Sequence, residues 1–236
     1  MSWTTPISQL IRDDFVLEDD YSTLYVTLQD ALLHRTGLPR HDLSPRSGEE
    51  SVKDVVRSLR YLPMTEPLRT TFQYCNLMYV TIGHVIETLT GQWEGDFLAQ
   101  RIWEPLNMTS TYFSLDDALN SGNPFARGYN WAPESRKFVE RAYVNETSMA
   151  GAGAVLSTVV DYAKWMKMLV TGAPPLSAGS HQALVGPQMV LGRGPGGYVM
   201  YAYGWVVQDY RGVKMIWHNG GENGVSHCSS SSCSIR

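Results

Sequence analysis

The sequence predicts an α+β fold, with helices through most of the chain and antiparallel strands near its end. Amphipathic helical spacing is clearest over residues 76–90, whereas the strand pattern is clearest over residues 198–217, which are rich in tyrosine, valine and tryptophan. The 236 residues are 43% hydrophobic and 18% charged, so the chain is long and apolar enough for one sizeable core or two small ones.

The first third of the chain predicts two short helices. Thr27-Leu28-Gln29-Asp30 has the capping-box pattern of a helix start, and the helix stops by Gly37. Two prolines and several polar residues make 38–48 a surface loop, after which apolar residues return at helical spacing over 49–59.

The central third contains the clearest element, a helix over Asn76–Thr90. Asn76 is a candidate cap, and Gly91 stands where a left-handed residue ends a helix. Residues 93–103 predict a second helix, ended by Pro105. Residues 120–146 are rich in glycine, proline and aromatic residues without a clear period, and we expect them to line a pocket.

The last third predicts a helix followed by a hairpin. Thr158 and Asp161 resemble a capping box, and the helix ends near Gly172. Strand patterns over 198–210 and 213–217 flank a turn at Arg211-Gly212, and this hairpin brings His218 to the end of its second strand. From 226 to 234, six of nine residues are serine, a composition that favours neither strand nor helix.

Composition excludes several classes of partner. The net charge is -4 and the lysines and arginines are scattered singly, so neither nucleic acid nor an anionic membrane surface is expected as a partner. We find no apolar window long enough to span a membrane and no secretion signal at the start. Three cysteines, an odd number, favour a reducing, cytoplasmic compartment. A small or neutral molecule is the expected substrate.

Polar residues near the predicted elements suggest acid–base chemistry. Tyr74 can act as a base only where nearby cations favour its phenolate, and Asn76 can hold a substrate carbonyl. His218 can protonate a leaving group, while Gly220 and Gly221 allow a ligand close to the backbone, where N–H groups can form an oxyanion hole. Taken singly, each has a structural alternative: an aromatic at a strand end, a helix cap and a hydrogen-bonded imidazole.

Two other chemistries are less favoured. The spacing of His218, His227, Cys228 and Cys233 fits no zinc pattern, so we expect neither a metal nor a cofactor. Cys75 lies inside the Tyr74-Cys75-Asn76 motif, but alternate residues of an extended segment point in opposite directions. Cys75 is therefore expected to be a buried thiol rather than a nucleophile.

Several motifs together resemble one family. They are Leu32-Leu33-His34-Arg35-Thr36-Gly37-Leu38-Pro39, Tyr74-Cys75-Asn76, Ile102-Trp103-Glu104-Pro105-Leu106-Asn107-Met108, the segment 151–165 and Trp217-His218-Asn219-Gly220-Gly221. In order and spacing they resemble the β-lactamase-related serine hydrolases, from about residue 3 to residue 225. That family includes class C β-lactamases, penicillin-binding proteins, esterases and acyltransferases of secondary metabolism.

The resemblance implies a role for each motif. In the family a Ser-x-x-Lys supplies the nucleophile, and Tyr-x-Asn and Lys/His-x-Gly elements complete the site. Tyr74 would be the base, Asn76 the orienting amide and His218 the third element, with Asn219 and Gly220 beside the substrate. The N–H of Gly221 would form half of the oxyanion hole. No Ser-x-x-Lys occurs in this sequence.

The resemblance also implies a partial fold. We expect a β-lactamase/transpeptidase-like domain over 1–225 that lacks the N-terminal strands, the nucleophile helix and the C-terminal strands, followed by a serine-rich tail over 226–236 outside the family. The intact protein would be a serine hydrolase or acyltransferase acting on a small acyl substrate through an acyl-enzyme, and this chain would be inactive. One alternative is a non-catalytic remnant that binds a small acyl compound or a homologous enzyme. Another is a chain without a stable fold.

Overall fold

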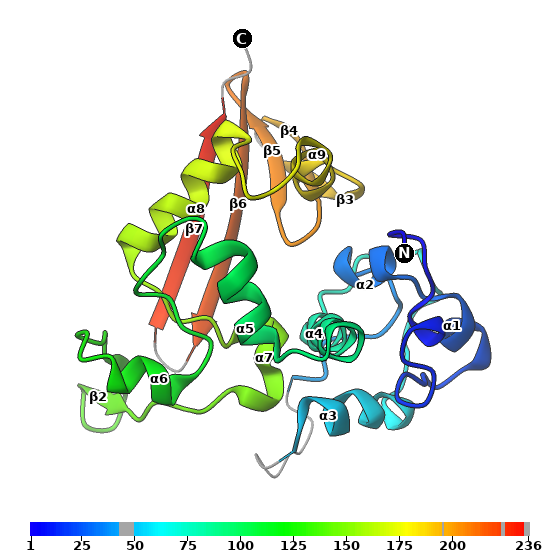
Figure 1. The fold of residues 1–236 in the computed structure, drawn as a ribbon, viewed down its shortest axis with the longest axis horizontal. Helices are drawn as coiled ribbons and strands as arrows, with labels where there is room; N and C mark the ends of the chain where they lie inside the picture. Colours follow the sequence, from blue (N-terminus) through cyan, green and yellow to red (C-terminus); the bar gives the residue numbers. More distant parts are fainter. Residues whose placement is uncertain (43–49, 195, 223–224, 234–236) are drawn as a thin grey trace.

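The computed structural model describes residues 1–42, 50–194, 196–222 and 225–233, and it forms a helical region beside a sheet (Figure 1). The helical elements, including 3-10 and π turns (η), are η1 (Ile7–Gln9), α1 (Asp20–Tyr25), α2 (Leu28–Leu32), α3 (Val52–Ser58), η2 (Leu59–Tyr61), α4 (Asn76–Thr90), α5 (Glu94–Leu98), η3 (Ala99–Trp103), α6 (Leu115–Asn120), η4 (Thr147–Met149), α7 (Ala150–Gly153), α8 (Val159–Thr171) and α9 (Ala178–Val185).

The strands form two antiparallel sheets. A two-stranded hairpin follows α6, and the main sheet has the order β3-β4-β5-β6-β7, so that each strand pairs with the next one along the chain. The strands are β1 (Gly128–Ala132), β2 (Lys137–Arg141), β3 (Met189–Gly194), β4 (Gly197–Tyr201), β5 (Val206–Tyr210), β6 (Val213–Glu222) and β7 (Val225–Cys233). The α+β prediction is confirmed.

The predicted helix starts are correct in two cases and wrong in one. Thr27 and Asp30 form a reciprocal capping box at α2, and the Thr158 side chain accepts from Asp161 N–H at α8. Helix α4 has the predicted bounds and ends at Gly91 with φ +67°. Asn76 is not its cap, however, because it is the first helical residue and its side chain donates to Asp42 instead.

The segment over residues 93–103 departs from the predicted single α-helix. The α-helical turn α5 continues into the π-helical η3. In a π-helix the backbone hydrogen bonds join residues five apart in sequence instead of four. Trp103 at its end is buried with Phe113, and their ring centroids lie 6.4 Å apart. This packing keeps the wider turn within the core formed by Trp103, Met108, Phe113, Ala150 and Ala154.

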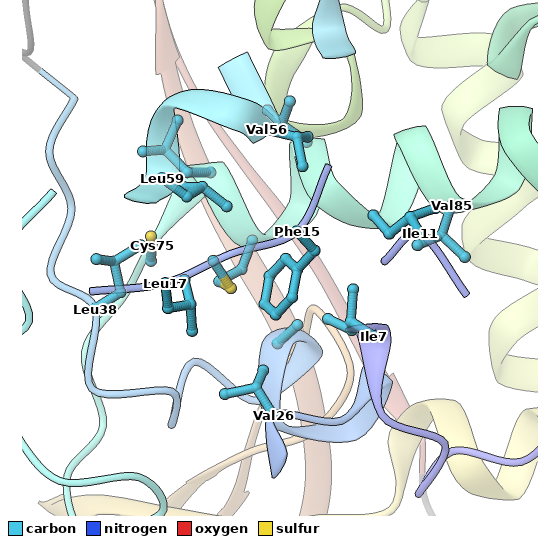
Figure 2. Packing of buried hydrophobic residues seen from close by; sticks show 14 of the residues in the cluster. Ile7, Ile11, Phe15, Leu17, Val26, Leu38, Val56, Leu59, Cys75 and Val85 are labelled. Atoms are coloured by element: carbon cyan, nitrogen blue, oxygen red, sulfur yellow. The ribbon is translucent and has the colours of Figure 1, made fainter. Parts of the chain in front are cut away.

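The main core of the helical region lies between α4 and the first third of the chain (Figure 2). Phe15 fills its centre and is fully buried, and Met78 and Val80 from α4 pack against it without exposed surface. Burying an apolar side chain of this size contributes about 1.5–3 kcal/mol, so this cluster holds α4 in position.

The main sheet is covered on both faces. Val207 of β5 and Ile216 of β6 pack against Met168 and Leu169 of α8. Their neighbours in sequence, Val206 and Trp217, lie in a different cluster with Leu33, Phe72 and Tyr201. Because successive residues of a strand point to opposite faces, one face of the sheet meets α8 and the other meets the helical region.

Strand β6 corrects two predictions. The β5–β6 turn has Arg211 at φ +52° and Gly212 at φ +78°, as a tight hairpin requires. Beyond this turn β6 runs on to Glu222, so His218 lies within the strand rather than at its end. The serine-rich segment was predicted to form no strand, yet Val225–Cys233 pairs with β6 from Glu222 to Lys214. Backbone hydrogen bonding in a hairpin does not depend on apolar side chains.

Candidate functional site

The structure brings two of the predicted site residues, Tyr74 and His218, together from the helical region and the sheet. Tyr74 and Cys75 lead into α4, and His218 lies on β6. The ring centroids of Tyr74 and His218 are 6.0 Å apart. His218 Nδ1–H donates to the Asn219 carbonyl at 2.7 Å, so in the neutral ring Nε2 is the acceptor, and Tyr201 Oη donates to it at 3.3 Å.

His34 holds the backbone on both sides of Tyr74. Its carbonyl accepts from Gln73 N–H at 2.7 Å, and its Nδ1 accepts from Cys75 N–H at 3.0 Å. The His34 side chain is fully buried, and burial, together with smaller effects of His218 and Arg40, lowers its pKa to about 3. His34 is therefore a neutral imidazole with its proton on Nε2, which has no hydrogen-bond partner among the described residues.

Aromatic rings surround His34. The ring centroid of Tyr74 lies 4.2 Å from that of His34, and Tyr79 is stacked on it at 5.1 Å. Tyr201 lies at 5.3 Å, and Tyr79 Oη donates to the Leu32 carbonyl at 2.9 Å. Burial raises the pKa of both Tyr79 and Tyr201 far above the ordinary value, so both phenols are neutral hydrogen-bond donors.

The environment of Tyr74 favours its neutral form. Burial raises the pKa of the Tyr74 phenol, and the Asp42 carboxylate raises it further. The Arg40 guanidinium lies 4.5 Å from the ring centroid and opposes both effects without reversing them. In the described structure Tyr74 is thus a hydrogen-bond donor, and a second cation near its oxygen would be needed to make it a base.

Asn76 belongs to a small polar network beside Tyr74. Its Nδ2 donates to Asp42 Oδ1 at 3.2 Å, and Asp42 Oδ2 accepts from Arg40 at 3.0 Å. The exposed side-chain fractions are 60% for Arg40 and 30% for Asp42, so the ion pair contributes little stability. Its effect is positional, because it fixes the amide of Asn76 and the guanidinium over Tyr74.

The predicted oxyanion segment forms an unusual part of the sheet. Asn219, Gly220 and Gly221 pair with Cys228, His227 and Ser226 of β7. On the opposite side, β5 pairs with β6 only as far as Trp217. Among the described strands, none covers the second edge of this segment, so a ligand can approach its backbone from that side. The oxyanion role of Gly221 stays a prediction.

The search for metal and membrane sites covers only the described residues. No group of three or more histidine, cysteine, aspartate or glutamate side chains there is arranged to hold a metal ion. The side chains of His227, Cys228 and Cys233 fall outside that description. Within the same part of the chain, no helix is long and apolar enough to cross a membrane.

Cys75 and the 120–146 segment match their predictions. Cys75 is a free, fully buried cysteine, and burial raises the pKa of its thiol to about 11, so it is not a nucleophile. The segment over 120–146 contains the β1–β2 hairpin and lines a cavity of about 350 Å³.

Sequence reasoning did not identify three residues of the site. His34 lies within the first motif, where only its resemblance to a family pattern drew attention. Arg40 and Asp42 lie in a segment predicted to be a surface loop. Two signals were available in the sequence. One is a histidine between an apolar pair and a glycine, and the other is a pair of opposite charges just after that glycine. Their contacts with Tyr74, Cys75 and Asn76 span more than thirty residues of sequence.

Comparison with known proteins places the chain among relatives of greater length. It is 41% identical over 231 residues to Unguisins hydrolase ungD′ of Aspergillus campestris. The aligned region covers 95% of this chain but only 43% of that protein. It is 38% identical over 251 residues to Unguisins hydrolase ungD of Aspergillus violaceofuscus, with 44% of that protein covered. The chain thus spans less than half the length of these curated relatives.

The fold is shared with solved structures. A D-stereospecific amidohydrolase from Streptomyces sp. superposes with a TM-score of 0.78 at 18% identity, over 98% of this chain and 71% of the other. At this identity the likeness shows the β-lactamase/transpeptidase-like fold alone. The family model described as Beta-lactamase matches residues 1–228, which is almost all of the 236 residues. The chain therefore belongs to the Beta-lactamase family.

Proposed function

We propose that this chain is the substrate-orienting and proton-handling part of a serine hydrolase or acyltransferase that works through an acyl-enzyme. The observation that carries the proposal is the 6.0 Å approach of the rings of Tyr74 and His218, which come from α4 and β6. Two titratable groups that meet where two structural regions join are a common arrangement for acid–base chemistry.

Each residue takes a role that its chemistry allows. Tyr74 transfers the proton between nucleophile and leaving group, Asn76 orients the substrate carbonyl, and His218 assists at the leaving group or binds an acidic group of the substrate. Asn219 and Gly220 lie beside the substrate, and the N–H of Gly221 contributes to the oxyanion hole. The uncovered edge of β6 beyond Trp217 supports this placement.

We propose a small amide or peptide as the substrate class, ahead of esters and lactams. Two observations support this choice. The names of the relatives and of the solved structure describe hydrolases of unguisins and an amidohydrolase. The sequence has no run of lysines and arginines to hold a polyanion, in agreement with a neutral substrate.

We further propose that this chain alone does not turn over a substrate. Its sequence contains no Ser-x-x-Lys, and the pKa of Tyr74 is raised rather than lowered. Loss of the attacking group removes several orders of magnitude of rate and leaves only binding and residual oxyanion effects. A lysine beside the phenol would lower the pKa of Tyr74, so nucleophile and base depend on the same motif.

The test compares the chain with a longer version of the same protein. Sequencing the complete transcript will determine whether an in-frame Ser-x-x-Lys precedes residue 3. We expect the 236-residue chain to hydrolyse neither p-nitrophenyl acetate nor phenylalanine p-nitroanilide above background. In a protein that carries the motif, Tyr74→Phe should lower kcat by about 10²–10⁴-fold. Tyr61→Phe is the matched control, because Tyr61 is 81% exposed.

Two results would contradict the proposal. If the chain alone turned over a substrate and Tyr74→Phe abolished that turnover, a nucleophile would have to lie within these 236 residues. Equal activity of the Tyr74→Phe and Tyr61→Phe variants of the longer protein would remove Tyr74 from the chemistry.

The non-catalytic alternative has one specific observation in its favour, the neutral state of Tyr74. In this case the chain would bind a small acyl compound or a homologous enzyme without reaction. Calorimetry with an ester, an amide and a homologous enzyme tests it, and heat from none of the three would reject it.

A further inference from the structure

Tyr201 is the last residue of β4, and its hydroxyl meets His218 of the candidate site. Tyr201 pairs with Val206 of β5, and Val206 pairs with Trp217 of β6. Because cross-strand partners lie side by side in a sheet, this row places Tyr201 at the level of the residue that precedes His218. The Tyr201 oxygen lies 3.3 Å from His218 Nε2. The register of the sheet thus brings a second phenol to the candidate site.

Packing holds the Tyr201 ring in this place. Only 2% of Tyr201 is exposed. From the helical region, the ring centroids of Phe72 and His34 lie 5.1 Å and 5.3 Å from that of Tyr201. The rings of Tyr201 and His218 meet edge to face at 6.2 Å. The phenol is therefore fixed between the helical region and the sheet, with its hydroxyl at the imidazole.

The single hydroxyl proton of Tyr201 has two neighbouring acceptors. One is the phenol oxygen of Tyr79, to which Tyr201 is hydrogen-bonded. Tyr79 donates its own proton to the Leu32 carbonyl at 2.9 Å, so towards Tyr201 it can only accept. The other acceptor is His218 Nε2. One proton serves one of these acceptors at a time.

His218 Nε2 is the stronger of the two acceptors. An imidazole nitrogen is a base with an ordinary pKa of about 6.5, whereas a phenol oxygen is a far weaker base. The Tyr79 oxygen also accepts a hydrogen bond from Gly204 N–H. His218 Nδ1–H donates to the Asn219 carbonyl at 2.7 Å, which leaves Nε2 without a proton in the neutral ring. The Tyr201 proton therefore points to His218.

We propose that Tyr201 is a positioning residue for His218. Its hydroxyl fixes the neutral imidazole as the Nδ1–H tautomer and holds the ring beside Tyr74, at a centroid distance of 6.0 Å. A third group that orients a catalytic imidazole in this way is a recurrent feature of hydrolase sites. The chemical role of His218 rests on the proposed function, whereas the action of Tyr201 on His218 rests on their geometry.

The tautomer of His218 can be measured whether or not the chain catalyses a reaction. The histidines are labelled with ¹⁵N, and long-range ¹H–¹⁵N correlation spectra are recorded at about pH 8, where an ordinary imidazole is neutral. His218→Gln identifies the signals of His218 among the six histidines. We expect Nδ1 to carry the proton and Nε2 to be the acceptor, the reverse of the tautomer that a free neutral histidine side chain favours in water.

Tyr201→Phe keeps the buried ring and removes only the hydroxyl. Nε2 then loses its donor, and the share of the Nε2–H tautomer should rise about fivefold, as the loss of one net hydrogen bond predicts. Tyr203→Phe is the matched control. Tyr203 is also buried, but its ring packs on Trp3 at a centroid distance of 5.0 Å, so loss of its hydroxyl should leave the tautomer unchanged.

A second variant tests the proton count with Tyr201 intact. Tyr79→Phe removes the competing acceptor, so Tyr201 should continue to donate to His218 and the Nδ1–H tautomer should keep its native share. If Tyr201→Phe does not fold, the spectra of the native chain and of Tyr79→Phe still decide the question.

Four results would overturn the proposal. The first is a native chain in which Nε2 carries the proton, and the second is a folded Tyr201→Phe variant with native tautomer shares. The third and fourth are a rise of the Nε2–H form in Tyr203→Phe or in Tyr79→Phe as large as the expected one. Hydrolysis is measured at no step, so this proposal and the proposed function fail separately.

Discussion

His34 should make the stability of the fold depend on pH in the acidic range. The side chain is fully buried, its Nδ1 accepts from Cys75 N–H, and its pKa is lowered to about 3 from an ordinary value of 6.5. Below 6.5 the unfolded chain binds a proton that the folded chain excludes. The stability that depends on neutral His34 is therefore complete above 6.5 and is lost as the pH falls from 6.5 towards 3.

The size of this effect follows from the ordinary pKa. About pH 5 lies about 1.5 units below the ordinary pKa of the imidazole in the unfolded chain. Each unit of that difference lowers the free energy of unfolding by about 1.4 kcal/mol. Between about pH 7.5 and pH 5, His34 should thus cost the folded state about 2 kcal/mol. The folded pKa of about 3 lies well below this range and hardly enters the figure.

Glu94 opposes this dependence. Burial and the neighbouring Glu87 raise the pKa of the Glu94 carboxyl to about 7 from 4.5. The stability from its neutral form is complete below 4.5 and is lost as the pH rises through 7, so it has the opposite slope. The pH profile of the native chain alone therefore cannot isolate His34.

A substitution separates the two groups. In His34→Asn the amide oxygen replaces Nδ1 as the acceptor for Cys75 N–H, and no group titrates at this position. Urea unfolding of both proteins from about pH 5 to pH 7.5 should give a stability difference that changes by about 2 kcal/mol, on top of a constant packing cost. Parallel profiles, with a change below about 0.5 kcal/mol, would refute the assignment of His34 as buried and neutral.

Two further predictions concern buried groups. The Asp30 carboxylate has no exposed surface and pairs with Arg35 at 2.7 Å and with Arg69 at 2.8 Å. Asp30→Ala should cost about 3 kcal/mol in urea unfolding at neutral pH, because two cations lose a buried partner, and a cost below about 1 kcal/mol would contradict this. Cys75 has a pKa of about 11 and no exposed surface, so it should resist iodoacetamide in the folded chain and react after unfolding. Peptide mass mapping measures this alkylation. Alkylation of Cys75 without denaturant would contradict its burial.

Local sequence signals predicted several of the helices, among them α2, α4 and α8, and the glycines that end α4 and α8. The bounds of α4 were correct because an apolar face and Gly91 mark its length and its end, although its start was predicted from Asn76 as a cap. The capping box of Thr27 and Asp30 was recognised because both partners lie within one turn. The prediction failed at Asn76, whose side chain can either cap a helix or bind another polar group. In the structure its amide donates to the Asp42 carboxylate.

Signals that depend on distant residues could not be read from the sequence. The serine-rich strand β7 forms because β6 offers backbone partners along its length, which side-chain propensity does not reveal. The role of His34 depends on Cys75, forty-one residues away. The cavity walls depend on four segments whose contacts only the folded chain provides, although the aromatic composition of residues 120–146 indicated a pocket.

The charges around Tyr74 connect the sequence and the structure in one argument. Arg40 is the cation that faces the ring, but its charge is shared with Asp42, and the pKa of Tyr74 remains raised. The motif that this sequence does not contain, Ser-x-x-Lys, would supply a nucleophile and a second cation together. A lysine close to the phenol oxygen would lower the pKa of Tyr74 and convert a donor into a base. The raised pKa of Tyr74 belongs to a chain without this motif, so we expect the proposed proton transfer at Tyr74 to depend on such a lysine.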